Sequence, residues 1–139
     1  MVLGPHWTGF DCICSIDTSM ESIYNCEKRF HKNYRVDLIH GNTIDELPKL
    51  LMYFLIVEIT FWLDAHNEND YPVLAELEVI KQHSIKTHII LIDDLRMFHT
   101  DKNGLTLDQI KAKILEINPN YKFSFENGHV KDDILVAKV

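Results

Sequence analysis

The side chains with the clearest chemical potential follow two apolar segments. Residues 61–63 lead into Asp64-Ala65-His66, and residues 89–92 lead into Asp93-Asp94. An amphipathic segment with an early proline, residues 71–83, lies between them, so the order predicts strand, helix, strand. Parallel strands end at the same edge of a sheet, where open α/β folds bind their ligands. Converging carboxylates at that edge would suit a hard divalent cation such as Mg²⁺.

Composition limits the classes of protein to consider. A chain of 139 residues with 46% hydrophobic and 25% charged residues is typical of one soluble domain. A formal net charge of -7 argues against nucleic acid as a partner, because binding to phosphates usually requires a basic surface. Leu50 to Leu63 is the longest apolar stretch, but Glu58 interrupts it, so we expect no membrane span. We also find no signal peptide pattern.

The three cysteines are Cys12, Cys14 and Cys26. Their odd number and irregular spacing argue against a disulfide scaffold and favour a reduced, cytoplasmic location. Cys12 and Cys14 would share one face of a strand. We interpret them as small buried hydrophobic residues, because a metal site would need further ligands that the sequence does not reveal.

Periodicity and turn signals predict one domain with the order β-α-β-α-β-α-β-α-β-β. Capping boxes are predicted at Thr18, Thr43 and Thr106, a helix start at Asp70 and a turn at Asn103-Gly104. The acidic stretch 126–133 is interpreted as a solvated turn, and Glu76 as part of a solvated or paired helix face. The predicted strands are Cys12–Ile16, Arg35–Ile39, Glu58–Leu63, Thr87–Ile92 and a closing antiparallel hairpin of Tyr121–Glu126 with Asp133–Val139.

The ordered set of motifs resembles the class I S-adenosylmethionine-dependent methyltransferases, and within them a subgroup of small-molecule and sugar O-methyltransferases. The resemblance rests on residues 15–19 before a helix, on residues 40–43, on residues 61–66 with 72–77, and on residues 90–98. It extends from about residue 12 to residue 139. It implies a Rossmann-like three-layer α/β sandwich with a mostly parallel sheet and a C-terminal antiparallel hairpin.

For the cofactor, the resemblance implies S-adenosylmethionine. Asp17, with Thr18 beside it, stands where that family's second strand ends in an acid that holds the ribose. An ionised carboxylate can accept hydrogen bonds from both ribose hydroxyls. Gly41 and Asn42 stand in the loop near the adenine, and Asp64 is also expected near the cofactor.

For catalysis, the resemblance implies that Asp64, Asp93 and Asp94 bind Mg²⁺. Asp64 would also orient or deprotonate the acceptor hydroxyl of a small molecule or sugar, since a metal-bound hydroxyl loses its proton more easily. His66 is a candidate general base, because its reference pKa lies near neutrality. In a polar loop, the same histidine would simply be solvated.

One departure separates this sequence from the family pattern. The first strand and Gly-rich loop of the family should precede Cys12, where eleven residues stand. We therefore expect residues 1–139 to form an N-terminally incomplete domain without the first strand, in which a homodimer would cover the exposed edges. The alternatives are a degenerate remnant acting as a non-enzymatic interaction module, and a receiver-like or phosphoryl-transfer domain with an acidic Mg²⁺ pocket.

Overall fold

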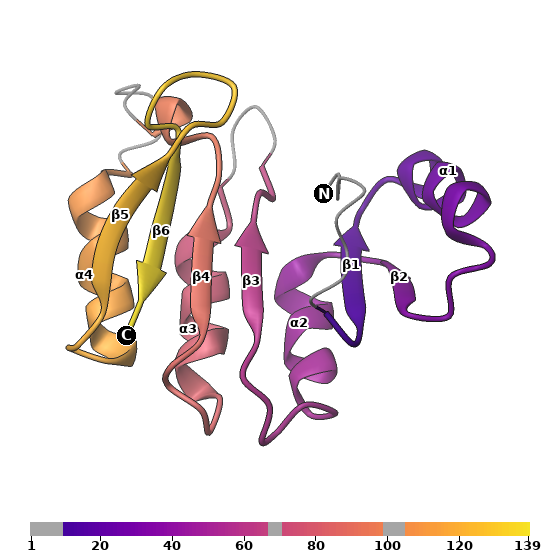
Figure 1. The fold of residues 1–139 in the computed structure, drawn as a ribbon, viewed down its shortest axis with the longest axis horizontal. Helices are drawn as coiled ribbons and strands as arrows, with labels where there is room; N and C mark the ends of the chain where they lie inside the picture. Colours follow the sequence, from indigo (N-terminus) through magenta and orange to yellow (C-terminus); the bar gives the residue numbers. More distant parts are fainter. Residues whose placement is uncertain (1–9, 67–70, 99–104) are drawn as a thin grey trace.

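The computed structural model describes residues 10–66, 71–98 and 105–139. Helices and strands alternate along the chain before two closing strands, as predicted (Figure 1). The predicted helix start at Asp70 and the turn at Asn103-Gly104 lie outside the described residues. The elements are β1 (Ile13–Asp17), α1 (Met20–Phe30), β2 (Val36–His40), α2 (Thr43–Leu51), β3 (Thr60–Leu63), α3 (Val73–Gln82), β4 (Ile89–Ile92), the short 3₁₀ helix η1 (Leu95–Met97), α4 (Leu107–Ile117), β5 (Lys122–Glu126) and β6 (Ile134–Lys138).

The strands form two hydrogen-bonded sheets. β1 and β2 pair in parallel, and a separate sheet has the order β3-β4-β6-β5. In the second sheet β3 and β4 are parallel, whereas β6 runs antiparallel to both β4 and β5. The predicted mixed α/β architecture with an antiparallel C-terminal hairpin is therefore confirmed. Among the described residues no strand joins β1 to β3, so the parallel part of the sheet is interrupted between them.

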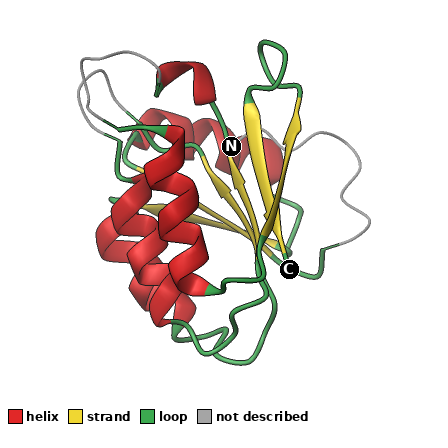
Figure 2. Cartoon of the chain, turned by 90° about the vertical axis from the view of Figure 1, so that its left-hand side faces the viewer, coloured by secondary structure: helices red, strands yellow, loops and turns green. Residues whose placement is uncertain are grey.

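The main core lies between the larger sheet and one layer of helices. α2 packs against α3 and α3 against α4, and this layer covers one face of the strands (Figure 2). The helices supply apolar residues at helical spacing, and the strands supply alternate residues. Fully buried members of the core include Leu77, Ile80, Ile90, Ile110, Ile114 and Leu135.

The opposite face of β4 is less covered than its apolar sequence predicts. Ile90 and Ile92 are buried, but Ile89 and Leu91 are only half-buried. The neighbouring Trp62 on β3 is 38% exposed. The sequence of β4 therefore resembles that of a strand covered on both faces, although only the helix-covered face is fully closed.

Two of the three predicted helix caps are displaced by one residue. Ser19 caps α1 in place of Thr18, with its hydroxyl accepting from the Ser22 amide. Asn42 caps α2 in place of Thr43. The capping box of Thr106 is present as predicted. Among the described residues, no helix is long and apolar enough to cross a membrane.

A buried pair of histidines ties the segment before β3 to β4. The Ile59 amide donates to His88 Nδ1 over 3.1 Å, so His88 carries its proton on Nε2 and donates to His83 Nδ1 over 2.9 Å. His83 Nε2 then donates to the Phe54 carbonyl over 3.0 Å. The Tyr121 hydroxyl completes the network by donating to the His88 carbonyl over 2.7 Å.

This network requires a neutral His88, which predicts acid sensitivity. Burial, then the charges of His83 and Lys86, lowers the pKa of His88 from 6.5 to about 4. Because the pKa is lower in the folded state, the stability that neutral His88 contributes is present above pH 6.5 and is lost as the pH falls toward 4. A shift of this size corresponds to about 3 kcal/mol in the free energy of unfolding.

Urea unfolding between pH 7.5 and pH 4.5 measures this dependence. We expect His88→Gln to be less stable at pH 7.5 and to lose less stability on acidification than the parent chain. The exposed His129 provides the control, since His129→Gln should keep the parent pH profile. Parallel profiles for the parent chain and His88→Gln would contradict the prediction.

Candidate functional site

The parallel pairing of β3 and β4 places two acidic loops side by side. Leu63 lies opposite Ile92 in the register, and the Asp93 amide donates to the Leu63 carbonyl over 3.1 Å. The chain after β3 therefore begins with Asp64 at the same edge at which the chain after β4 begins with Asp93. As the sequence predicts, the carboxylates of the two loops meet at the carboxyl edge of the sheet.

Within this edge, Asp64, His66 and Asp94 form one compact group, which we call the acid-histidine group. A potential ligand atom from each lies within 4.8 Å of the others. Asp94 adopts a left-handed conformation with φ of 58°, and its Oδ2 lies 3.0 Å from His66 Nε2. Asparagine and aspartate tolerate this conformation better than most residues. The left-handed turn thus brings Asp94 to the β3 loop.

Asp93 lies differently from its neighbour. Its Oδ1 accepts from the Asp94 amide over 2.8 Å, and it belongs to a second cluster with Asp94 and Asp133. The structure therefore brings two of the three predicted metal ligands, Asp64 and Asp94, together with His66. Asp93 lines the same pocket, with its Oδ1 bound to the Asp94 amide.

The electrostatics of the acid-histidine group favour a bound cation. Desolvation, followed by the negative charges of Asp93 and Asp94, raises the pKa of Asp64 above its ordinary value. A divalent cation would offset the repulsion between these carboxylates. Oxygen ligands from two aspartates also match the donor set that Mg²⁺ prefers, with waters completing the shell.

Aromatic residues form one wall of the same pocket. Tyr71 stacks on His66 with ring centroids 5.7 Å apart, and Phe98 contacts Tyr71 at 5.2 Å. Tyr71 and Phe98 line the pocket together with Asp64 and Asp94. The stacking restricts the His66 ring, while the carboxylate of Asp94 fixes its orientation. The pocket combines ionisable groups with aromatic side chains.

Arg96 links Asp94 to the buried carboxylate of Asp133. Arg96 Nη1 lies 2.7 Å from Asp94 Oδ1 and also donates to Asp133, which is only 1% exposed. Burial alone would raise the pKa of Asp133, but hydrogen bonds from the Arg96 and Val130 amides and the guanidinium charge hold that pKa below its ordinary value. Asp133 is therefore a buried support of the site, which corrects its interpretation as part of a solvated turn.

Glu76 is a second buried acid that the sequence analysis interpreted wrongly. It lies on α3, is 2% exposed and lines the same pocket as Asp64. Its Oε2 has no hydrogen-bond partner among the described residues. Burial raises its pKa, and a hydrogen bond with Thr43 opposes that shift. The apolar positions around Glu76 on α3 are typical of a helix face that packs into the core. A glutamate within such a face was the signal in the sequence that its carboxyl would be buried.

The predicted cofactor residues gather at the ends of β1 and β2. Asp17 lies opposite His40, and its main-chain carbonyl accepts from the Gly41 amide over 3.0 Å. His40 Nε2 lies 3.1 Å from the Thr18 carbonyl. Asp17, Thr18 and Gly41 are thus brought together, and Figure 1 shows β1 pointing in the same direction as β3 and β4.

Two of these polar side chains already have structural roles. Asp17 Oδ1 accepts from the Ser19 amide over 2.7 Å, at the start of α1. Asn42 Oδ1 accepts from the Ile44 amide over 2.9 Å and so caps α2. A Cβ at Gly41 would lie 2.6 Å from Glu46 Cγ, so the absence of a side chain there accommodates Glu46. Asp17 retains free acceptor capacity on its carboxylate, which has about four lone-pair sites.

Comparison with known proteins identifies the fold. No protein-family model and no curated protein matches the sequence. Solved structures do match. An O-methyltransferase from Bacillus cereus in complex with SAH aligns with 92% of the chain at 15% identity and a TM-score of 0.59. An SAH-bound Podospora anserina methyltransferase aligns with 91% at 16% identity and a TM-score of 0.57, and a TehB-like SAM-dependent methyltransferase from Corynebacterium glutamicum aligns with 91% at 14% identity and a TM-score of 0.51.

These similarities confirm the predicted resemblance at the level of the fold. The chain spans 62% of the Bacillus cereus protein, 60% of the Podospora anserina protein and 66% of the Corynebacterium glutamicum protein, which is less than two thirds of each. The chain therefore has the α/β fold of these methyltransferases over nearly its whole length, without matching all of any one of them.

Because the Glu76 carboxyl is buried, we expect Glu76→Gln to increase the stability of the protein in a pH-dependent way. Because the folded-state pKa is raised, protonated Glu76 stabilises the fold at low pH, and that contribution is lost as the pH rises through the folded-state pKa. Glu76→Gln should therefore raise the free energy of unfolding at pH 7.5 by about 1 kcal/mol. The gain should disappear near pH 4, where both side chains are neutral.

Denaturant unfolding at both pH values tests this expectation. Glu78 lies on the same helix and pairs with Lys113. Glu78→Gln should therefore lower stability slightly at pH 7.5, in the opposite direction from Glu76→Gln. If Glu76→Gln were destabilising at pH 7.5 while still folded, the prediction would be wrong and the charged carboxylate would be favoured in the folded protein.

Proposed function

We propose that this protein is an S-adenosylmethionine-dependent methyltransferase that transfers a methyl group to a hydroxyl of a small molecule or sugar, with assistance from Mg²⁺. The observation that carries the proposal is the acid-histidine group, Asp64, His66 and Asp94, at the carboxyl edge of a methyltransferase-like fold. Two of the matching structures contain S-adenosylhomocysteine, which supports the cofactor assignment. A cytoplasmic location belongs to the same proposal.

Each half of the proposed site has a distinct task. On the cofactor side, the carboxylate of Asp17 would accept hydrogen bonds from the ribose, with Thr18, Gly41 and Asn42 around the adenosine. On the acceptor side, Asp64 and Asp94 would hold Mg²⁺. Of the two aromatic residues, the half-buried Tyr71 would contact the acceptor, and the buried Phe98 would support it.

The proposed proton transfer follows from the His66–Asp94 contact. With its Nε2 proton directed to Asp94 Oδ2, His66 presents Nδ1 as an acceptor for the hydroxyl proton. The Asp94 carboxylate would then stabilise the imidazolium that forms. A hydroxyl bound to Mg²⁺ loses its proton more readily, so metal and base would act in the same direction. The remaining requirement is alignment of the acceptor oxygen with the methyl group.

The alternative proposal is a degenerate methyltransferase-like domain that serves as a non-enzymatic interaction module. The interruption of the sheet between β1 and β3 favours it, because the two proposed halves of the site lie on opposite sides of that interruption. Binding of the cofactor product separates the two proposals without knowledge of the acceptor.

Calorimetric titration of the purified chain with S-adenosylhomocysteine is the direct test. We expect micromolar affinity, and Asp17→Asn should weaken it at least about tenfold, because a hydrogen bond to a charged group contributes about 1.5–3 kcal/mol. The exposed Asp108, on α4, provides a matched control, and Asp108→Asn should bind as the parent chain does. A well-folded sample that does not bind would favour the interaction module.

The metal assignment has a separate test with Mn²⁺, a paramagnetic substitute for Mg²⁺. Electron paramagnetic resonance should detect one bound ion per chain, and Asp64→Asn should weaken its binding at least about tenfold, since losing one carboxylate of a small oxygen-ligand set removes a full negative charge. Asp108→Asn is again the control. Equal Mn²⁺ affinity in Asp64→Asn and the parent chain would contradict the role given to Asp64.

A further inference from the structure

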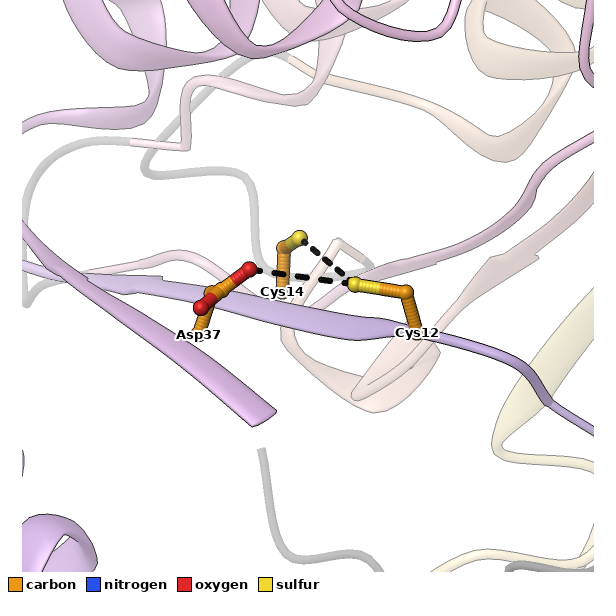
Figure 3. Close-up of side chains that lie close together, drawn as sticks. All are labelled: Cys12, Cys14 and Asp37. Carbon is orange, nitrogen blue, oxygen red and sulfur yellow. Dashed lines mark hydrogen bonds between the residues drawn. The ribbon is translucent and has the colours of Figure 1, made fainter. Parts of the chain in front are cut away.

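A second group of potential ligands lies on the smaller sheet, away from the acid-histidine group. Cys12 precedes β1 and Cys14 lies on it, two residues apart, so their side chains leave the same face of the strand. Cys14 lies opposite Asp37 in the parallel register with β2. Figure 3 shows the two thiols and the Asp37 carboxylate directed toward one another.

The distances match those around a tetrahedral zinc ion. Cys12 Sγ lies 3.8 Å from Cys14 Sγ and 3.8 Å from Asp37 Oδ2. A tetrahedral ion with Zn–S bonds of about 2.3 Å requires a separation of ~3.8 Å between two sulfurs, and of ~3.6 Å between a sulfur and a carboxylate oxygen. Two of the three separations therefore already match those around one ion, and the third, between Cys14 and Asp37, is at most 4.8 Å.

We propose that Cys12, Cys14 and Asp37 form a binding site for a zinc-type divalent cation, distinct from the proposed Mg²⁺ site. Two thiolates exclude Mg²⁺ as the preferred ion, and one carboxylate oxygen favours Zn²⁺ over softer Cu(I). Three protein ligands leave a fourth position for water or an external ligand. Cys12 and Asp37 are exposed, so an ion can enter from solvent.

The charge balance of this site depends on the ion. When the two thiols bind a divalent cation, two S–H protons leave to solvent and two thiolate–metal bonds form. Affinity should therefore increase steeply with pH, because protons compete with the ion.

The expected structural effect is a cross-link within the smaller sheet. β1 and β2 hydrogen-bond only to each other among the described strands. A metal bound by Cys12, Cys14 and Asp37 would connect the two strands through their side chains. Since a ligand that binds only the folded state stabilises it, added Zn²⁺ should raise the unfolding temperature of the chain.

Cadmium titration of the reduced chain is the primary experiment, because thiolate–cadmium bonds absorb in the ultraviolet. We expect a charge-transfer band that saturates at one ion per chain and that Zn²⁺ displaces. Cys12→Ser and Cys14→Ser should each halve the band and weaken binding at least about tenfold. Asp37→Asn should weaken binding similarly but keep the full band, since both sulfur ligands remain.

Two control variants separate this site from other groups. Cys26→Ser removes the remaining cysteine, which lies on α1, and Asp64→Asn alters the acid-histidine group. Both variants should keep the full band and the parent affinity. The proposal would be overturned by the absence of a band in the parent chain, or by a band that Cys26→Ser abolishes and Cys12→Ser does not.

Alkylation of the unmodified sequence provides a test that does not depend on any variant folding. With Zn²⁺ present, mass spectrometry should find Cys12 and Cys14 protected from iodoacetamide, while Cys26 reacts as it does without metal. Equal alkylation of all three thiols with and without Zn²⁺ would contradict the proposal. It would also be contradicted if Cys12 and Cys14 formed a disulfide in air but the reduced protein did not bind Zn²⁺.

Discussion

The parallel pairing of β3 with β4 is the constraint on which the rest of the candidate site depends. Because Leu63 and Ile92 lie opposite each other, the segments that follow β3 and β4 leave the sheet at the same edge and at the same level. Asp64 can then approach Asp94 across the two loops without a long connection. The helix α3 between the strands supplies the buried face that sets this register, since a shift by one residue would turn the core side chains outward.

The antiparallel C-terminal hairpin supports that edge as well as closing the sheet. Asp133 precedes β6, and its buried carboxylate binds Arg96, which in turn binds Asp94. A charge this deeply buried must be paired, so the position of Asp94 is coupled to the packing of the last strand. A continuous series of ion pairs therefore runs from the buried Asp133 through Arg96 to Asp94, which contacts His66 near the surface.

The interruption of the sheet divides the proposed activity between two units. Asp17 belongs to the β1–β2 pair and Asp64 to the larger sheet, and no strand-to-strand hydrogen bonds connect the units among the described residues. α2 packs on β1 and also on α3, so side-chain packing connects them instead. The smaller unit also contains Cys12, Cys14 and Asp37, and a metal there would strengthen the part with the fewest sheet partners.

Local patterns in the sequence determined the order of elements, the closing hairpin, the Thr106 cap and the acids at the ends of β3 and β4, because these features depend on periodicity and near neighbours. Only the tertiary structure decided which acids meet. The left-handed turn at Asp94 separates it from Asp93, burial of Asp133 and Glu76 depends on distant packing, and Asp37 reaches the cysteines only through the β1–β2 register. Apart from the turn at Asp94, these contacts join residues far apart in the chain, so no local spacing encodes them.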